Sequence, residues 1–171
     1  MFGITIRVSN EAAAFWNLVD EAAALEDAPS FRALNYPAHL TLARYGAIEP
    51  ARLAAGLEIL ASAGPLTIAF DRVCFFDNAP LVLWLRPRED RGLRDLHRHL
   101  HAAIGEDGCD PHYRPLQWQP HATLASSVPG RNRQNALDFA EKPIADFSMT
   151  FDIADALHWP PVSILHSRQL A

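Results

Sequence analysis

The chain has 171 residues, of which 49% are hydrophobic and 20% charged, so it is neither a disordered nor a fibrous protein. Its formal net charge is −5 at pH 7, which excludes the strongly basic surface that holds long nucleic acids by counterion release. Two cysteines are too few for a disulfide framework and fit a reducing compartment. Because we find neither a signal-peptide layout nor an apolar run of roughly 18 residues, we expect a cytoplasmic protein that does not associate with membranes.

The first half of the chain shows the hydrophobic patterns of three strands and two helices. Alternation with period two predicts strands, Asn10 is expected to cap the first helix, and Pro50 is expected to open the second. The predicted elements are a strand at 3–8, a helix at 10–27, a strand at 39–44, a helix at 49–64 and a strand at 66–76.

The second half shows the same order of elements. It is predicted to contain a strand at 81–86, a helix at 89–104, a strand at 121–126, a helix at 131–142, a strand at 147–158 and an additional strand at 162–169. The segment HLTLA at 39–43 matches HATLA at 121–125, an offset of 121 − 39 = 82. Two weaker matches occur in the same order at similar offsets, which indicates an internal duplication.

The duplication defines the expected organisation. We predict an α+β protein whose duplicated β-α-β-α-β halves, about 1–79 and 80–171, pack as two lobes around a central cleft. The connection at 77–80 has only four residues of turn chemistry, too few to separate independent domains. The whole chain is therefore expected to form a single two-lobed domain.

The repeated segments carry the residues suited to chemistry. Side chains two residues apart on a strand share a face, so His39 lies beside Thr41, and His121 beside Thr123. If the lobes are related by a pseudo-twofold axis, the two imidazoles face one bound group from opposite sides. In-line displacement at phosphorus needs such a base and acid, and threonine hydroxyls can bind the phosphate oxygens. The ordinary pKa of histidine, about 6.5, suits both roles, and this arrangement requires no metal.

These residues resemble the 2H phosphoesterase superfamily, whose signature is two His-x-(Thr/Ser)-x motifs, one in each half of a duplicated chain. The motifs stand here as His39-Leu40-Thr41-Leu42 and His121-Ala122-Thr123-Leu124. Within the superfamily the chain looks most like the 2′-5′ RNA ligase-like and cyclic phosphodiesterase branch. The resemblance covers essentially all 171 residues.

The resemblance implies a two-lobed fold with mostly antiparallel sheets and helices outside, and a site without metal or cofactor. It implies that His39 and His121 are the catalytic acid and base, and that Thr41 and Thr123 bind phosphate. The implied substrate is the 2′,3′-cyclic phosphate of an RNA end or a small nucleotide, or the ends joined in the reverse 2′-5′ ligation. Which histidine is the acid, and which direction the reaction takes, stay open.

Further residues are candidates for substrate contacts. An aromatic ring can stack on a base, and a guanidinium group can bind phosphate oxygens. These candidates are Tyr45, which we expect at the mouth of the cleft, Arg7 and Arg86 on the opening strands, and Arg114 and Trp118 in the loop before the second motif. His97, His99 and His101 are expected to lie on a solvent-exposed helix face rather than to bind a metal.

Two other hypotheses stay open beside the enzyme. The chain can be a non-catalytic module that binds nucleotides or RNA ends, or a structural protein whose histidines are core residues. Intact motifs in both halves favour the enzyme, because a mere binding module has no need of an acid and a base on opposite walls. We expect a monomer that acts on an RNA end or a cyclic nucleotide and does not bind long nucleic acid.

Overall fold

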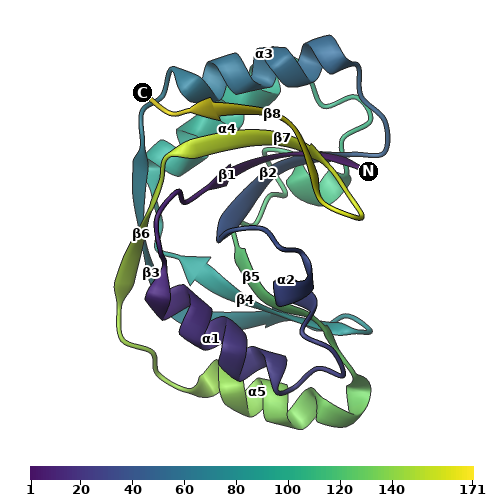
Figure 1. Cartoon of the computed structure of the whole chain (residues 1–171), viewed down its shortest axis with the longest axis vertical. Coiled ribbons are helices and arrows are strands. Elements are labelled where there is room, and N and C mark those ends of the chain that lie inside the picture. Colours follow the sequence, from purple (N-terminus) through teal and green to yellow (C-terminus); the bar gives the residue numbers. More distant parts are fainter.

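The computed structural model describes all residues, 1–171, and contains two four-stranded antiparallel sheets with the four longer helices on their outer faces and a short helix beside strand β5 (Figure 1). This confirms the predicted α+β class. The helices are α1 (Ala13–Ala23), α2 (Ser30–Ala33), α3 (Pro50–Ala61), α4 (Arg91–Ile104) and α5 (Arg133–Glu141). None of them is long and apolar enough to cross a membrane.

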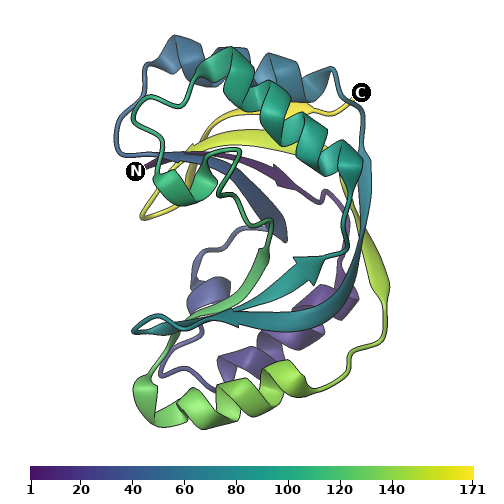
Figure 2. The same ribbon diagram turned by 180° about the vertical axis from the view of Figure 1, so that it is seen from behind.

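The first sheet carries the first His-x-Thr motif. Its strand order is β2-β1-β7-β8, and its strands are β1 (Phe2–Arg7), β2 (His39–Tyr45), β7 (Ile153–His158) and β8 (Ser163–Gln169). Helices α3 and α4 lie together over the outer face of this sheet (Figures 1 and 2).

The second sheet carries the second motif. Its strand order is β5-β4-β3-β6, and its strands are β3 (Leu66–Phe76), β4 (Leu81–Pro87), β5 (Ala122–Val128) and β6 (Phe147–Phe151). Helices α1 and α5 cover its outer face, as the lower part of Figure 1 shows. The two sheets have the same layout, with β5, β4, β3 and β6 corresponding to β2, β1, β7 and β8.

The two halves of the sequence exchange strands between the sheets. Strand β3 comes from the first half but pairs with β4 and β6, whereas β7 and β8 come from the second half and extend the first sheet beyond β1. The prediction of one strand at 147–158 is therefore wrong. The chain crosses from one sheet to the other at Asp152, whose carboxylate accepts a hydrogen bond from the backbone N–H of Ser9 (2.8 Å).

Most predicted helices are confirmed with small changes at their ends. Pro50 is the first residue of α3, and the carboxylate of Asp90 caps α4 by accepting a hydrogen bond from the backbone N–H of Leu93 (2.8 Å). The cap predicted for Asn10 is wrong, because α1 begins at Ala13 after Ala12 and has no side-chain cap.

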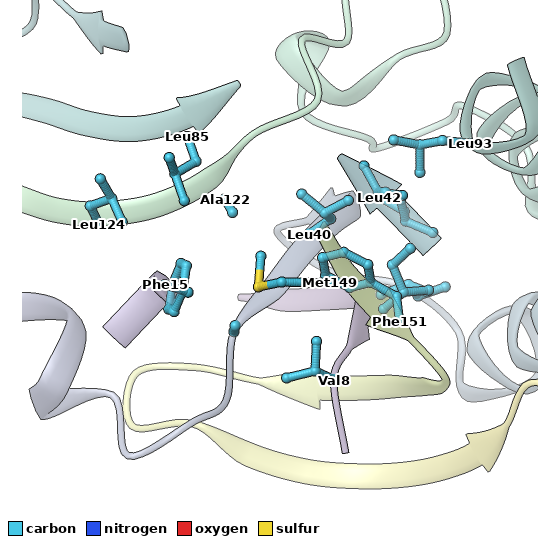
Figure 3. Close-up of a cluster of buried hydrophobic side chains, with 14 of the residues drawn as sticks. Val8, Phe15, Leu40, Leu42, Leu85, Leu93, Ala122, Leu124, Met149 and Phe151 are labelled. Atoms are coloured by element: carbon cyan, nitrogen blue, oxygen red, sulfur yellow. The ribbon is translucent and has the colours of Figure 1, made fainter. Parts of the chain in front are cut away.

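A single hydrophobic core runs through both sheets. It comprises 39 contiguous buried residues, which favours one cooperative unit over two separate lobes. Figure 3 shows Leu40 and Leu42 of β2 in this cluster together with Ala122 and Leu124 of β5. These are the residues that alternate with the histidines and threonines of the two motifs, so burial of the leucines turns the polar residues away from the core.

Candidate functional site

The two histidines are anchored in the same way. His39 begins β2 and donates its Nδ1–H to the carbonyl of Pro37 (2.8 Å), while His121, directly before β5, donates Nδ1–H to the carbonyl of Gln119 (2.7 Å). In both cases the acceptor lies two residues earlier in the chain. This bond fixes the tautomer of a neutral imidazole, so that Nε2 carries the free lone pair and is able to accept a proton.

Aromatic side chains hold each imidazole ring. The ring of Phe31 stacks on His39 with centroids 5.5 Å apart, and Tyr36 approaches His39 edge-on at 4.9 Å. On the other side, Phe76 and Trp84 meet His121 edge-on at 5.2 and 5.8 Å. These contacts restrict the rotation of both rings and remove water from them.

Burial keeps both histidines neutral. Desolvation lowers the pKa of His39 from its ordinary 6.5 to about 4; the Pro37 carbonyl opposes this shift, and the charge of His121 adds to it. Desolvation also lowers the pKa of His121, and the nearby cation of Arg44 lowers it further. Both imidazoles are therefore neutral at pH 7, and an anionic phosphate bound beside either of them will favour its protonation.

The two threonines offer free hydroxyl groups. Thr41 and Thr123 are half-buried, and neither hydroxyl has a hydrogen-bond partner in the protein. Across the strands, Thr41 pairs with Thr5 of β1, and Thr123 pairs with Trp84 of β4. Each hydroxyl is thus available to a ligand on the histidine-bearing face of its sheet.

A bulge follows each motif and changes which residues face the site. The pairing of β2 with β1 shifts at Leu42, and that of β5 with β4 shifts at the equivalent Leu124. The bulges bring Arg44 and Ser126 into the lining of a pocket with His121. Sequence reasoning missed both residues, because strict alternation along the strand assigns them to the opposite face.

The same bulge corrects the placement of Tyr45. Its side chain is fully buried, and its hydroxyl donates a hydrogen bond to the carbonyl of Gly105 (2.9 Å). The expected position at the cleft mouth, which followed from strand parity with His39, is therefore wrong.

The pocket beside His121 has a volume of about 390 Å³ and a mainly polar lining. Besides His121 it is lined by Arg44, Phe76, Asn78, Val82, His112, Tyr113, Gln117, Gln119, Thr123 and Ser126. Arg44 is oriented by Asp110, to whose carboxylate its Nε donates (2.9 Å), and its guanidinium lies over the ring of Tyr113 at 5.2 Å. The pocket therefore combines a fixed cation, amides and aromatic rings, which suits an anionic nucleotide.

The surroundings of the two histidines differ in polarity. On the His39 side a fully buried carboxylate, Asp155, accepts hydrogen bonds from Arg7 (2.6 Å), Tyr36 (2.6 Å) and Ser167 (2.6 Å). The position equivalent to Asp155 on the other side is Cys74, next to Trp84. Arg7 is consequently held by a buried ion pair, not directed at a ligand.

The structure places the remaining candidates outside this pocket. The guanidinium of Arg86 pairs with Asp71 (2.8 Å), and that of Arg114 donates to the carbonyl of Cys109 (3.1 Å). Trp118, expected at the substrate, is instead buried, and its indole N–H donates to the carbonyl of Thr41 (3.1 Å). Trp118 therefore stabilises the backbone of the first motif and does not face a substrate.

The expectation of a solvent-exposed histidine face on α4 is wrong for two residues. His97 and His101 are buried, and only His99 is exposed. His97 donates Nε2–H to the carbonyl of Tyr113 (3.0 Å) and stacks on Trp118 with centroids 3.9 Å apart; His101 donates to the carbonyl of Leu42 (3.2 Å). These two histidines connect α4 to the elements that form the site.

Comparison with known proteins identifies the class. The family model of the 2′-5′ RNA ligase superfamily matches residues 11–159, and the chain belongs to this superfamily of 2H phosphoesterases. Membership supports a phosphoesterase or RNA ligase-like activity. No curated protein sequence matches the chain.

Solved structures show the same fold. E. coli LigT complexed with 3′-AMP is similar with a TM-score of 0.66 and 18% identity, covering 99% of this chain and 97% of that one. The protein TT0787 of Thermus thermophilus is similar with a TM-score of 0.63 and 15% identity, again over 99% and 97%. A crystal structure of a phosphoesterase matches with a TM-score of 0.58 and 21% identity over the same shares.

Proposed function

We propose that this chain is a metal-independent phosphoesterase that opens 2′,3′-cyclic phosphates at the ends of RNA or of nucleotides. The observation that carries the proposal is the identical anchoring of His39 and His121. Both imidazoles donate Nδ1–H to a carbonyl two residues earlier, which leaves both Nε2 atoms for proton transfer. The complexes of LigT with 3′-AMP, NADP+ and ATP agree with a nucleotide ligand for this fold.

The reaction follows from the chemistry of the two motifs. One imidazole accepts a proton from water as the water oxygen bonds to phosphorus, and the other, protonated, gives its proton to the departing ribose oxygen. The P–O bond to that oxygen breaks, and a phosphomonoester remains on the other ribose oxygen. Thr41 and Thr123 donate hydrogen bonds to the non-bridging oxygens, where negative charge increases in the transition state.

The same site serves ligation when a 5′-hydroxyl takes the place of water. The basic imidazole takes the proton of this hydroxyl as its oxygen bonds to phosphorus, and the acidic imidazole protonates the 3′ oxygen as the bond from phosphorus to that oxygen breaks, which leaves a 2′-5′ linkage. Since each proton is handled by an imidazole, neither hydrolysis nor ligation requires a metal ion.

Hydrolysis of defined substrates tests the proposal. Four 2′,3′-cyclic mononucleotides and an RNA oligomer with a cyclic phosphate end are incubated with the protein in EDTA. We expect turnover with at least one of them, and we expect His39→Ala and His121→Ala each to lower kcat by about 10³-fold. His99→Ala, on the exposed face of α4, is the matched control and should keep full activity.

Two outcomes contradict the proposal. Activity that appears only on addition of a metal ion excludes the mechanism. Tight binding of cyclic nucleotides by a folded protein that turns over none of them indicates the non-catalytic binding module instead.

A further inference from the structure

Arg72 is the only arginine of the chain whose guanidinium has no partner. The chain has 14 arginines, since Lys142 is the only lysine among its 15 basic residues. Eleven arginines form ion pairs with carboxylates, and Arg52 and Arg114 donate to backbone carbonyls. Arg72 is exposed, and it has neither kind of contact. Its charge is therefore available to a ligand.

Strand register places Arg72 on the same face of the second sheet as His121. Arg72, Cys74 and Phe76 alternate along β3, and Phe76 packs against His121. Arg72 pairs across the strands with Arg86, and Cys74 pairs with Trp84, the neighbour of Thr123. Arg72 thus lies two residues further along the sheet than the row that holds Thr123. Since β4 lies between β3 and β5, two strand spacings of roughly 4.8 Å and a step of roughly 7 Å along the strand separate the Cα atoms of Arg72 and Thr123 by about 12 Å, part of which the long arginine side chain can span.

A second pocket surrounds Arg72. Its volume is about 770 Å³, and it adjoins the pocket of His121 because Gln119 lines both. Its lining includes three cations, Arg72, Arg86 and Lys142, and two carboxylates, Asp71 and Glu141, together with Trp84, Gln119 and apolar residues. Trp84 also lines the pocket, and its indole N–H, which is shielded from solvent, has no hydrogen-bond partner. The pocket thus combines the unpaired cation of Arg72 with an unsatisfied donor that a ligand reaches only if the indole shifts.

We propose that this second pocket binds a phosphate attached to the 5′ oxygen of the nucleotide whose cyclic phosphate reacts at His39 and His121. The proposal rests on the proposed function and narrows its substrate: the preferred molecule carries at least two phosphates, and a bare cyclic mononucleotide fills only half of the site.

The charges of the lining favour an anion, because three cations stand against the two carboxylates of Asp71 and Glu141. Asp71 already neutralises Arg86 and lies within 3.8 Å of Arg88, so the carboxylate nearest to Arg72 is engaged with other cations. The guanidinium of Arg72 presents a planar set of donors that fits two phosphate oxygens. Lys142 also lines the pocket, and its charge is balanced by that of Glu141, so Arg72 supplies the positive charge that a ligand can use.

Kinetics with three substrates test the subsite. These are a nucleoside 2′,3′-cyclic phosphate, the same compound with a 5′-phosphate, and a dinucleotide that ends in the cyclic phosphate. We expect kcat/KM to be about tenfold or more higher for the second and third than for the first, the value of one charge-assisted hydrogen bond. Arg72→Gln should remove this gain and leave the first substrate unchanged. Arg98→Gln, exposed on α4, is the matched control and should change none of the three.

The three substrates separate the two sources of a 5′ phosphate. A gain for the dinucleotide alone assigns the pocket to an internal phosphodiester, and a gain for both assigns it to either form. The proposal is overturned if Arg72→Gln lowers kcat/KM equally for all three substrates, or if the wild type does not distinguish them.

Binding without turnover keeps this test independent of catalysis. A nucleoside 3′,5′-bisphosphate and the matching 3′-monophosphate are titrated calorimetrically into the wild type and Arg72→Gln. We expect the bisphosphate to bind about tenfold tighter, and only to the wild type. If this preference appears in a protein that hydrolyses nothing, the subsite stands and the proposed function fails. If hydrolysis occurs without the preference, the proposed function stands and the subsite fails.

Discussion

At the scale of single residues, the site depends on how two imidazoles are oriented and desolvated. The carbonyls of Pro37 and Gln119 fix the tautomers, and aromatic neighbours remove water. Desolvation lowers the pKa of both histidines, because a charged imidazole loses its hydration in this environment. In the free protein both histidines are therefore mainly neutral at pH 7.

The lowered pKa values of the two histidines predict the pH dependence of catalysis. One histidine must be protonated and the other neutral, and both pKa values lie below 6.5 in the free protein. We expect kcat/KM, which reports the free enzyme, to be highest between about pH 4 and 6.5. It should then fall by about tenfold per pH unit on the alkaline side, as the acid loses its proton. Initial rates at low substrate concentration from pH 4 to pH 9 measure this, and a rate that rises up to pH 9 contradicts the assignment.

At the scale of elements, the bulges in β2 and β5 decide which residues reach the pocket. Each inserts one leucine into the pairing, so that the residue two positions later changes face. Arg44 thereby enters the pocket, and Tyr45 enters the core. Alternation alone predicts the opposite for both residues.

Removal of the Arg44 charge tests this geometry. We expect Arg44→Gln to lower kcat/KM by about 10- to 100-fold, because a charged hydrogen bond to an anionic substrate is lost. The substitution should also raise the pKa of His121 toward its ordinary value, since Arg44 lowers it. The alkaline limb of the pH profile then moves to higher pH, which mere disruption of the fold would not cause. Arg98→Gln serves as the control, and an unshifted limb contradicts the role.

The hydrogen bond from His97 of helix α4 to the carbonyl of Tyr113 makes the stability of the fold sensitive to acid. Burial lowers the pKa of His97 to about 3, and the charges of His101 and Arg94 act in the same direction. Between pH 6.5 and about 3 the unfolded chain binds a proton at this residue that the folded chain does not, so the free energy of unfolding decreases as the pH falls.

Replacement of His97 tests this linkage. We expect the wild type to lose roughly 2 kcal/mol of stability at this site between pH 6.5 and pH 5, at about 1.4 kcal/mol per unit. His97→Gln keeps a donor for the Tyr113 carbonyl but does not titrate. The free energy of unfolding of this variant should therefore decrease by roughly 2 kcal/mol less than that of the wild type between pH 6.5 and pH 5. Urea unfolding at several pH values measures the difference, and parallel curves for the two proteins would falsify the prediction.

At the scale of the whole molecule, the exchange of strands joins the halves of the sequence. Strand β3 leaves the first half to pair in the second sheet, and β7 returns from the second half to pair with β1. Neither half has its complete sheet, and one core runs through both. We therefore propose that the chain is a single domain in the thermodynamic sense.

Fragments of the chain test this unity. Residues 1–79 alone lose the partners of β3 and one partner of β1, so we expect no cooperative unfolding transition in circular dichroism. Mixing fragments 1–79 and 80–171 should restore the native spectrum, because each supplies the strands that the other lacks. A fragment 1–79 that unfolds cooperatively by itself contradicts the proposal.

The sequence by itself determined the α+β class, the duplicated order of elements and the two His-x-Thr pairs. These features rest on local periodicity and on repeated residues, which short-range physics governs. Most strand and helix positions follow for the same reason. The family likewise follows from the motifs.

Only the tertiary structure decided how the elements pair and which polar residues are free. The crossing at Asp152, the bulges at Leu42 and Leu124, and the burial of His97 depend on contacts between segments far apart in the chain. Distant contacts also decide which arginines form ion pairs. Arg7 pairs with Asp155, whereas Arg72 has no partner. A side chain's partners depend on the packed chain, whereas its residue type and local pattern can be known from the sequence.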